Sequence, residues 1–139
     1  MSERNFNMRL KCRYEGDGND ITRLKVEHKV DNEWVSLDLG IVSPGFDIFV
    51  YAIFACQHRF FRVTCAERKL YLSSAEGSIT IAVDKDWHME TLRVHFSGKL
   101  DSGQSGQHDI DAVVARMKQC PVSRNLGNIP HAETTVTLA

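Results

Sequence analysis

Residues 46–56 read FDIFVYAIFAC, a run in which Asp47 is the only charged side chain. Nothing between positions 46 and 68 breaks a helix, and an acidic residue in the first turn interacts favourably with the helix dipole. The pattern therefore predicts one long helix over 46–68. Its first half is apolar on every side, which is typical of a buried helix, whereas the half that begins at Gln57 is polar and is expected to reach solvent.

Strand patterns lie on both sides of this helix, and in most of them apolar and polar side chains alternate between turn residues. The expected strands are 6–14, 21–30, 34–39, 78–83, 92–97 and 134–138, and an amphipathic helix is expected around 110–117. Strands grouped around a long helix favour an α+β class over a parallel α/β fold. The whole chain, 1–139, is expected to form a single domain.

The composition excludes several classes of protein. Among 139 residues, 25% are charged and the net charge is −1, which argues against nucleic acid or a membrane as the main partner, because both favour a basic surface. The polar N-terminus, Met1–Asn5, has no secretory signal, and 46–56 is too short to span a bilayer, so a cytoplasmic location is expected. No Cys/His spacing predicts a metal site, and no nucleotide-cofactor motif is present.

A helix that is apolar on every side is hard to cover within one chain of this size. A single sheet covers one side of such a helix only. A second copy of the chain is the simplest cover for the other side. The sequence therefore predicts a homodimer.

Cys56 and Cys120 have the most distinctive settings of the cysteines. Cys56 ends the apolar run, and Arg59 follows one turn later, where a guanidinium would favour the reactive thiolate. Cys120 precedes Pro121, and proline is well placed at the first position of a helix. Cys120 is therefore expected as an N-cap with backbone N–H groups near its sulfur, a geometry that activates a thiol.

The alternative for any of these thiols is a small buried packing residue, since free cysteine is often no more than that. We favour packing for Cys12 and Cys65, whose surroundings carry no feature of a reactive thiol. His58 is two residues from Cys56 and is expected to point away from it on a helix, which disfavours a Cys–His pair.

Two stretches resemble the signature regions of the OsmC/Ohr family, the osmotically inducible protein C and organic hydroperoxide resistance proteins. They are Ser43-Pro44-Gly45-Phe46-Asp47-Ile48-Phe49 with Ala52 and Ala55-Cys56, and Cys120-Pro121-Val122-Ser123-Arg124-Asn125-Leu126. The order of elements is similar too, so the likeness covers nearly the whole chain. The chain resembles a divergent branch of this family.

The resemblance implies an α+β, OsmC-like fold with antiparallel sheets packed on a long central buried helix, in an intertwined homodimer. It also implies a thiol-dependent peroxidase that reduces organic hydroperoxides in oxidative-stress defence. In such an enzyme Cys56 attacks the peroxide, Cys120 resolves the sulfenic acid as a disulfide, and a dithiol reductant such as a lipoyl group regenerates both thiols. The implied arginine–acid pair has Asp47 and Arg23, or Arg13, as its candidates.

Phe46 stands where the organic-peroxide subgroup has a glutamate, which leaves Asp47 as the nearest acid. This departure favours two other hypotheses, a structural role or a non-enzymatic protein that binds a hydrophobic ligand. The pocket for such a ligand would be lined by Phe46, Phe49, Phe60 and Phe61. The pair of thiols favours the peroxidase, which is expected to prefer bulky organic hydroperoxides over hydrogen peroxide because the surroundings of Cys56 are apolar.

Overall fold

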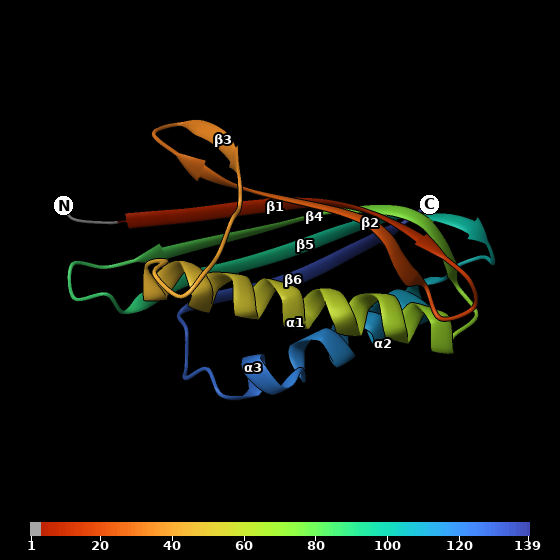
Figure 1. Cartoon of the computed structure of the whole chain (residues 1–139). Coiled ribbons are helices and arrows are strands. Elements are labelled where there is room, and N and C mark those ends of the chain that lie inside the picture. The colour runs from red at the N-terminus through yellow and green to blue at the C-terminus, as the bar shows by residue number, and fades with distance from the viewer. Residues whose placement is uncertain (1–3) are drawn as a thin grey trace.

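The computed structural model describes residues 4–139, so the first three residues of the polar N-terminus lie outside the described part. A six-stranded sheet carries all helices of that part on one face (Figure 1). The strands are β1 (Arg4–Glu15), β2 (Asp20–Val30), β3 (Glu33–Ser36), β4 (Tyr71–Val83), β5 (Met89–Ser102) and β6 (His131–Leu138). The helices are α1 (Gly45–Glu67), α2 (Gln107–Lys118) and α3 (Pro121–Arg124). No helix among the described residues is long and apolar enough to cross a bilayer.

The strand order is β3-β2-β1-β4-β5-β6, and neighbouring strands are antiparallel except for β5 and β6, which are parallel. The predicted α+β class is confirmed, although the strands form one mixed sheet rather than separate antiparallel sheets. The parallel pair follows from the connection, because α2 and α3 carry the chain back to the starting edge of β5.

The expected strands all form, with different ends. β3 stops at Ser36 rather than residue 39, and β4 begins at Tyr71 rather than residue 78. The sequence did not predict the start of β4 at Tyr71, because Gly77 is a residue that weakens the interior of a strand. Here the glycine is required, because a Cβ at this position would lie 2.5 Å from Cε1 of the buried Phe96 ring.

The long helix α1 lies across the sheet, with α2 packed beside it and over β6 (Figure 1). Its buried positions recur at helical spacing: Val50, Ile53, Phe54, Gln57, His58, Phe61, Thr64 and Cys65. The prediction of a buried first half and an exposed second half is wrong within one chain. Ile48 and Phe49 are 42% and 36% exposed, whereas Gln57 and His58 are buried. Direction around the helix, rather than position along it, decides burial.

Asn19 connects three elements at one end of the sheet. It adopts φ 50° in the β1–β2 turn and is fully buried. Its side-chain amide donates to the carbonyl oxygens of Arg62 and Leu70, both at 3.0 Å, and its side-chain oxygen accepts from the Leu72 N–H at 2.8 Å. A single polar side chain therefore supplies hydrogen-bond partners for the backbone groups where α1 ends and β4 begins.

Candidate functional site

Cys56 and Cys120 lie beside each other, one on α1 and the other at the start of α3. Cys120 is the N-cap residue of α3, with an extended backbone (φ −61°, ψ 148°) and proline at the next position. Its sulfur accepts a hydrogen bond from the Ser123 N–H at 3.4 Å. The predicted N-cap is therefore confirmed, and the sequence signal was the proline that follows the cysteine.

The pKa of Cys56 is raised above its ordinary value, chiefly because burial disfavours the thiolate and further because the Cys120 thiol lies beside it. The Val122 N–H and, last in size, the charge of Arg59 act in the opposite direction. Arg59 therefore lies where it was expected, but its charge does not overcome the burial. Within one chain the expected activation of Cys56 is not achieved.

A partly buried network of hydrogen bonds links Cys120 to the sheet. The Cys120 thiol donates to Ser123 Oγ at 3.0 Å, and Gln57 Nε2 donates to the same oxygen at 3.1 Å. Thr134 Oγ1 on β6 then donates to Gln57 Oε1 at 3.2 Å. A role for Ser123 or Gln57 was not predicted from the sequence. Their signals were available: a serine at the third position of a capped turn, and the first polar residue after the apolar run.

Two cavities lie close to α3. One, of about 320 Å³, is bounded by Gln57, Ser123 and Thr134 on one side and by the 126–129 loop on the other. The second, of about 620 Å³, lies between Phe60 on α1 and Pro121 on α3. Neither cysteine lines these cavities, which lie beside the side chains that hold Cys120. Cys120 itself is fully buried, and Cys56 is the more accessible thiol.

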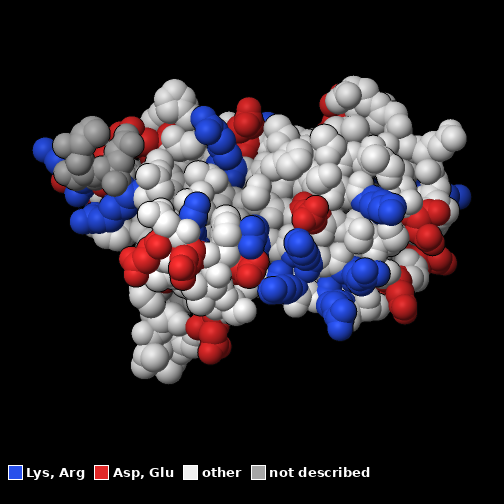
Figure 2. Space-filling view, turned by 90° about the horizontal axis from the view of Figure 1, so that it is seen from above, with Lys and Arg blue, Asp and Glu red and all other residues white. Residues whose placement is uncertain are grey.

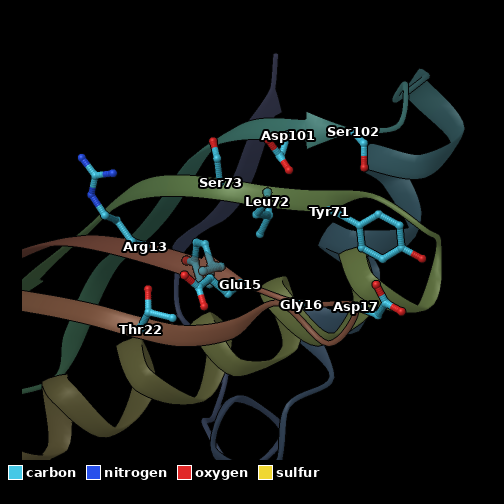
Figure 3. Close-up of a pocket in the computed structure, with 11 residues that line it drawn as sticks. Arg13, Glu15, Gly16, Asp17, Thr22, Tyr71, Leu72, Ser73, Asp101 and Ser102 are labelled. Atoms are coloured by element: carbon cyan, nitrogen blue, oxygen red, sulfur yellow. The ribbon is translucent and has the colours of Figure 1, made fainter.

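The proposed acid and arginines are not brought to Cys56 of their own chain. Asp47 precedes Cys56 by nine residues, which places it about 14 Å away along the helix axis and half a turn around it. Arg13 and Arg23 face each other in the β1–β2 register, on the sheet face opposite the buried Cys12. Figure 3 shows Arg13 pointing away from α1, at the edge of a cavity of about 420 Å³ that it shares with Glu15, Asp17 and Asp101.

The aromatic residues expected to line one ligand pocket are divided between two places. The Phe46 ring packs against Phe6 and Trp87, with ring centroids 4.6 and 5.3 Å away. Phe61 is buried at the other end of α1 and stacks on Phe96 at 4.9 Å. The expected single pocket is therefore not formed within one chain, because these residues lie along more than four turns of the same helix.

Cys12, Cys65 and His58 are placed as predicted. Both cysteines are buried in the core, and burial raises the pKa of Cys65 to about 12, which leaves it unreactive at neutral pH. His58 points toward β1, where its Nε2 lies 2.7 Å from the Tyr14 hydroxyl. It is therefore part of the core and not a partner of Cys56.

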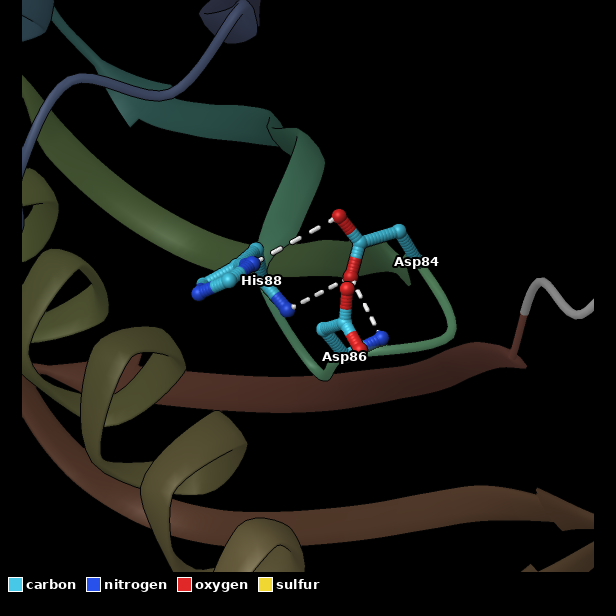
Figure 4. A group of neighbouring side chains, drawn as sticks. All are labelled: Asp84, Asp86 and His88. Carbon is cyan, nitrogen blue, oxygen red and sulfur yellow. Dashed lines mark hydrogen bonds and ion pairs between the residues drawn. The ribbon is translucent and has the colours of Figure 1, made fainter.

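Asp84, Asp86 and His88 form a cluster in the β4–β5 turn (Figure 4). Asp84 Oδ1 accepts from the backbone N–H groups of Asp86 and His88 at 2.8 and 3.0 Å, and Oδ2 lies 3.6 Å from His88 Nδ1. These bonds hold a turn in which Trp87 has φ 66°. The contacts of the cluster are internal to the turn, and they assign it a structural role.

Replacing Ser123 with alanine is expected to slow oxidation of Cys56 and Cys120 to a disulfide about tenfold. The change removes the hydroxyl, which accepts a hydrogen bond from the Cys120 thiol and can turn to donate one to the thiolate, but keeps the backbone N–H bond. One hydrogen bond to a charged group is worth about 1.5 kcal/mol or more. Stopped-flow oxidation with diamide, quenched by acid and analysed by mass spectrometry, gives the rate. Ser123→Thr keeps the hydroxyl and should oxidise as the parent does. Equal slowing in both variants would contradict a role for the hydroxyl.

Comparisons with known proteins identify the fold. No family model matches the chain, and no curated protein matches it by sequence. An OsmC-like hydroperoxide resistance protein from Jannaschia sp. CCS1 is similar with a TM-score of 0.60 and 16% identity, over 89% of this chain and 87% of the other. An OsmC-like protein from Mycoplasma pneumoniae has a TM-score of 0.50 and 12% identity, over 83% of this chain and 87% of the other.

An osmotic stress induced and detoxification response protein from Psychrobacter arcticus gives a TM-score of 0.50 with 13% identity, over 94% of both chains. A structural likeness at sequence identities this low establishes the fold and not the activity. The expected OsmC-like fold is thereby confirmed.

Proposed function

We propose, from the OsmC-like fold and the cysteine pair within it, that the chain is a thiol-dependent peroxidase of a divergent OsmC/Ohr branch. The Cys56 thiolate attacks the terminal oxygen of an organic hydroperoxide, which breaks the O–O bond, releases an alcohol and leaves Cys56 as a sulfenic acid. The Cys120 sulfur then displaces water from that sulfenic acid and forms the disulfide. A dithiol such as a lipoyl group reduces the disulfide by exchange and is itself oxidised to a cyclic disulfide.

The observation that carries the proposal is the position of the two sulfurs. The more accessible thiol, Cys56, lies beside a fully buried second thiol whose sulfur is held by Ser123. A peroxidatic cysteine must meet its substrate from solvent, whereas a resolving cysteine need only meet the first sulfur. Oxidative-stress defence in the cytoplasm fits this chemistry, because the chain's free thiols suit a reducing compartment.

A homodimer is the second part of the proposal, and it supplies what one chain lacks. Apolar side chains are exposed on the helix side of the structure: Ile48 and Phe49 on α1, and Leu24 and Val35 on β2 and β3. In the loop that leads into α1, Ile41 and Val42 are 100% and 94% exposed. Large apolar side chains exposed in this number on one side of the structure favour an interface there. A partner packed there would bring new groups to the Cys56 side of α1, including the cation that activation requires.

Sedimentation equilibrium at micromolar concentration is expected to show a dimer. Phe49→Glu places a charge in the apolar surface and should shift the protein toward monomer, because an unpaired charge is costly to bury. Ser78→Glu, on the opposite face of β4, is the matched control and should remain dimeric. A parent protein that stays monomeric across this range would overturn the dimer.

Peroxide consumption with dihydrolipoamide as reductant tests the activity. Cumene hydroperoxide is expected to give a kcat/KM at least about tenfold above that of hydrogen peroxide, which is the gain from burying about two CH₂ groups in the transition state. Cys56→Ser should abolish turnover. The Cys120→Ser variant should react once with peroxide at Cys56 and then stop, leaving a sulfenic acid that dimedone traps. Cys12→Ala, a core variant, should retain the parent rate.

A non-enzymatic protein that binds a hydrophobic ligand is the second candidate, and the raised pKa of Cys56 favours it. The same experiment separates the two functions. Absence of turnover with either peroxide, with Cys56 shown to be reduced and the protein dimeric, would exclude the peroxidase. Saturable quenching of tryptophan fluorescence by a fatty acid would then support the binding protein.

A further inference from the structure

The sheet face that points away from the helices carries an unusual arrangement of charge. Lys11 and Arg13 on β1 lie directly opposite Lys25 and Arg23 on β2 in the strand register. All four side chains point to the outer face, because the alternate residues Cys12 and Tyr14 are buried against α1. Figure 2 views this outer face and shows lysine and arginine side chains gathered on it. We call these four residues the cationic quartet.

Like charges directly opposite each other on neighbouring strands destabilise a sheet. The quartet contains two such pairs side by side, Lys11 with Lys25 and Arg13 with Arg23. Two carboxylates pair with the lysines: Lys11 Nζ lies 3.9 Å from Glu76, and Lys25 Nζ lies 3.7 Å from Glu27. Glu27 is also held by Arg9 at 2.8 Å. Glu15, Asp17 and Asp101 line the neighbouring cavity that Arg13 also borders, without forming an ion pair with it. Among the ion pairs of residues 4–139, none includes Arg13 or Arg23.

The quartet lines a depression of about 420 Å³ whose lining also includes Ser74 and Glu76 on β4. Paired residues on neighbouring strands have Cβ atoms about 5 Å apart, and alternate residues along a strand are about 7 Å apart. Four cationic side chains therefore rise from a rectangle small enough for their charged ends to meet one compact ligand. The Ser74 hydroxyl adds a hydrogen-bonding group to the same surface.

We propose that the cationic quartet binds a compact ligand that carries two or more linked phosphate groups. Arginine matches phosphate oxygens with paired N–H groups, and lysine adds a point charge. A ligand with several negative charges would neutralise both like-charge pairs at once. This site lies on the opposite side of the sheet from Cys56 and Cys120, so it is independent of the peroxidase proposal.

Two features favour a compact phosphate over nucleic acid or a membrane. Trp34 on this face already has Arg9 at 4.2 Å and Lys29 at 5.6 Å from its ring, so it does not offer a free face for base stacking. The exposed apolar residues of β2 and β3, such as Leu24 and Val35, pair with residues of the helix-side face. These apolar side chains are therefore not on the outer face, where they could insert into a bilayer beside the quartet.

Isothermal titration calorimetry with inorganic tripolyphosphate and pyrophosphate at low salt tests this site. One ligand per chain is expected, with tripolyphosphate tighter than pyrophosphate and both tighter than orthophosphate. Affinity should fall as salt is raised. The double variant R13Q/R23Q should weaken binding at least tenfold. It should also be no less thermally stable without ligand than the parent, because it removes a like-charge pair.

Arg93→Gln is the matched control, since Arg93 lies on the same face but outside the depression, opposite Glu133. The affinity of the Arg93→Gln variant for tripolyphosphate should stay within twofold of the parent value. The proposal is overturned if neither probe binds saturably, if R93Q weakens binding as much as the double variant, or if the double variant binds as the parent does. It is also overturned if phosphatidylserine vesicles or a single-stranded oligonucleotide bind more tightly than tripolyphosphate.

Discussion

Replacing Asn19 with alanine is expected to lower the free energy of unfolding by about 3–4 kcal/mol. The substitution removes three hydrogen bonds: those with the Leu70 carbonyl and the Leu72 N–H are buried, and that with the Arg62 carbonyl is partly buried. Each costs about 1 kcal/mol or more when its partner is left buried without a replacement. Alanine also fits the positive φ of 50° less well than asparagine. Urea denaturation followed by circular dichroism measures the loss.

Two variants separate these contributions. Asn19→Gly accommodates the positive φ but removes the same bonds, so it should lose nearly as much stability as Asn19→Ala. Asn32→Ala places alanine at a second asparagine with positive φ, 66° in the exposed β2–β3 turn, and should cost only about 1 kcal/mol. If the Asn19→Gly variant were as stable as the parent, the backbone angle rather than the hydrogen bonds would be the important feature.

Acidification is expected to remove roughly 3 kcal/mol of stability through His58 alone. The pKa of this buried histidine is lowered from 6.5 to about 4, first by burial and second by the charge of Arg62. In the unfolded chain the histidine takes up its proton near pH 6.5. Between that pH and about 4 the unfolded state therefore binds more protons than the folded state. The contribution of His58 to stability is fully present above pH 6.5 and is lost progressively as the pH falls to about 4. Below that pH, His58 causes no further change.

Urea denaturation of the parent and of His58→Gln between pH 8 and pH 4 isolates this contribution. His58→Gln cannot take up the proton, so its stability should fall by roughly 3 kcal/mol less than that of the parent over this range. His131→Gln removes an exposed histidine and should keep the full acid loss of the parent. Parallel curves for the parent and His58→Gln would show that His58 does not control the acid response.

The long helix, most strands and the N-cap at Cys120 could be predicted because each depends on neighbours in the sequence. Helical and strand periodicities are local, and proline restricts the residue before it. The same applies to the packing role of Cys65 and to the orientation of His58 away from Cys56. The alternation along β1 also placed Arg13 on the polar face of its strand. The resemblance to a peroxidase suggested an activating role for this arginine that its strand position does not support.

Other features depend on pairings between distant segments, which no local pattern contains. The parallel direction of β6 is decided by where α2 and α3 return the chain, and Gln57 is buried because Ser123 and Thr134 supply its hydrogen bonds. The cationic quartet exists only because the β1–β2 register places Lys11 opposite Lys25, and a shift of one residue would separate the pairs. Local periodicity thus determined the elements and the two candidate thiols. The tertiary structure decided which side chains meet, because strand register and helix direction bring together residues far apart in the chain.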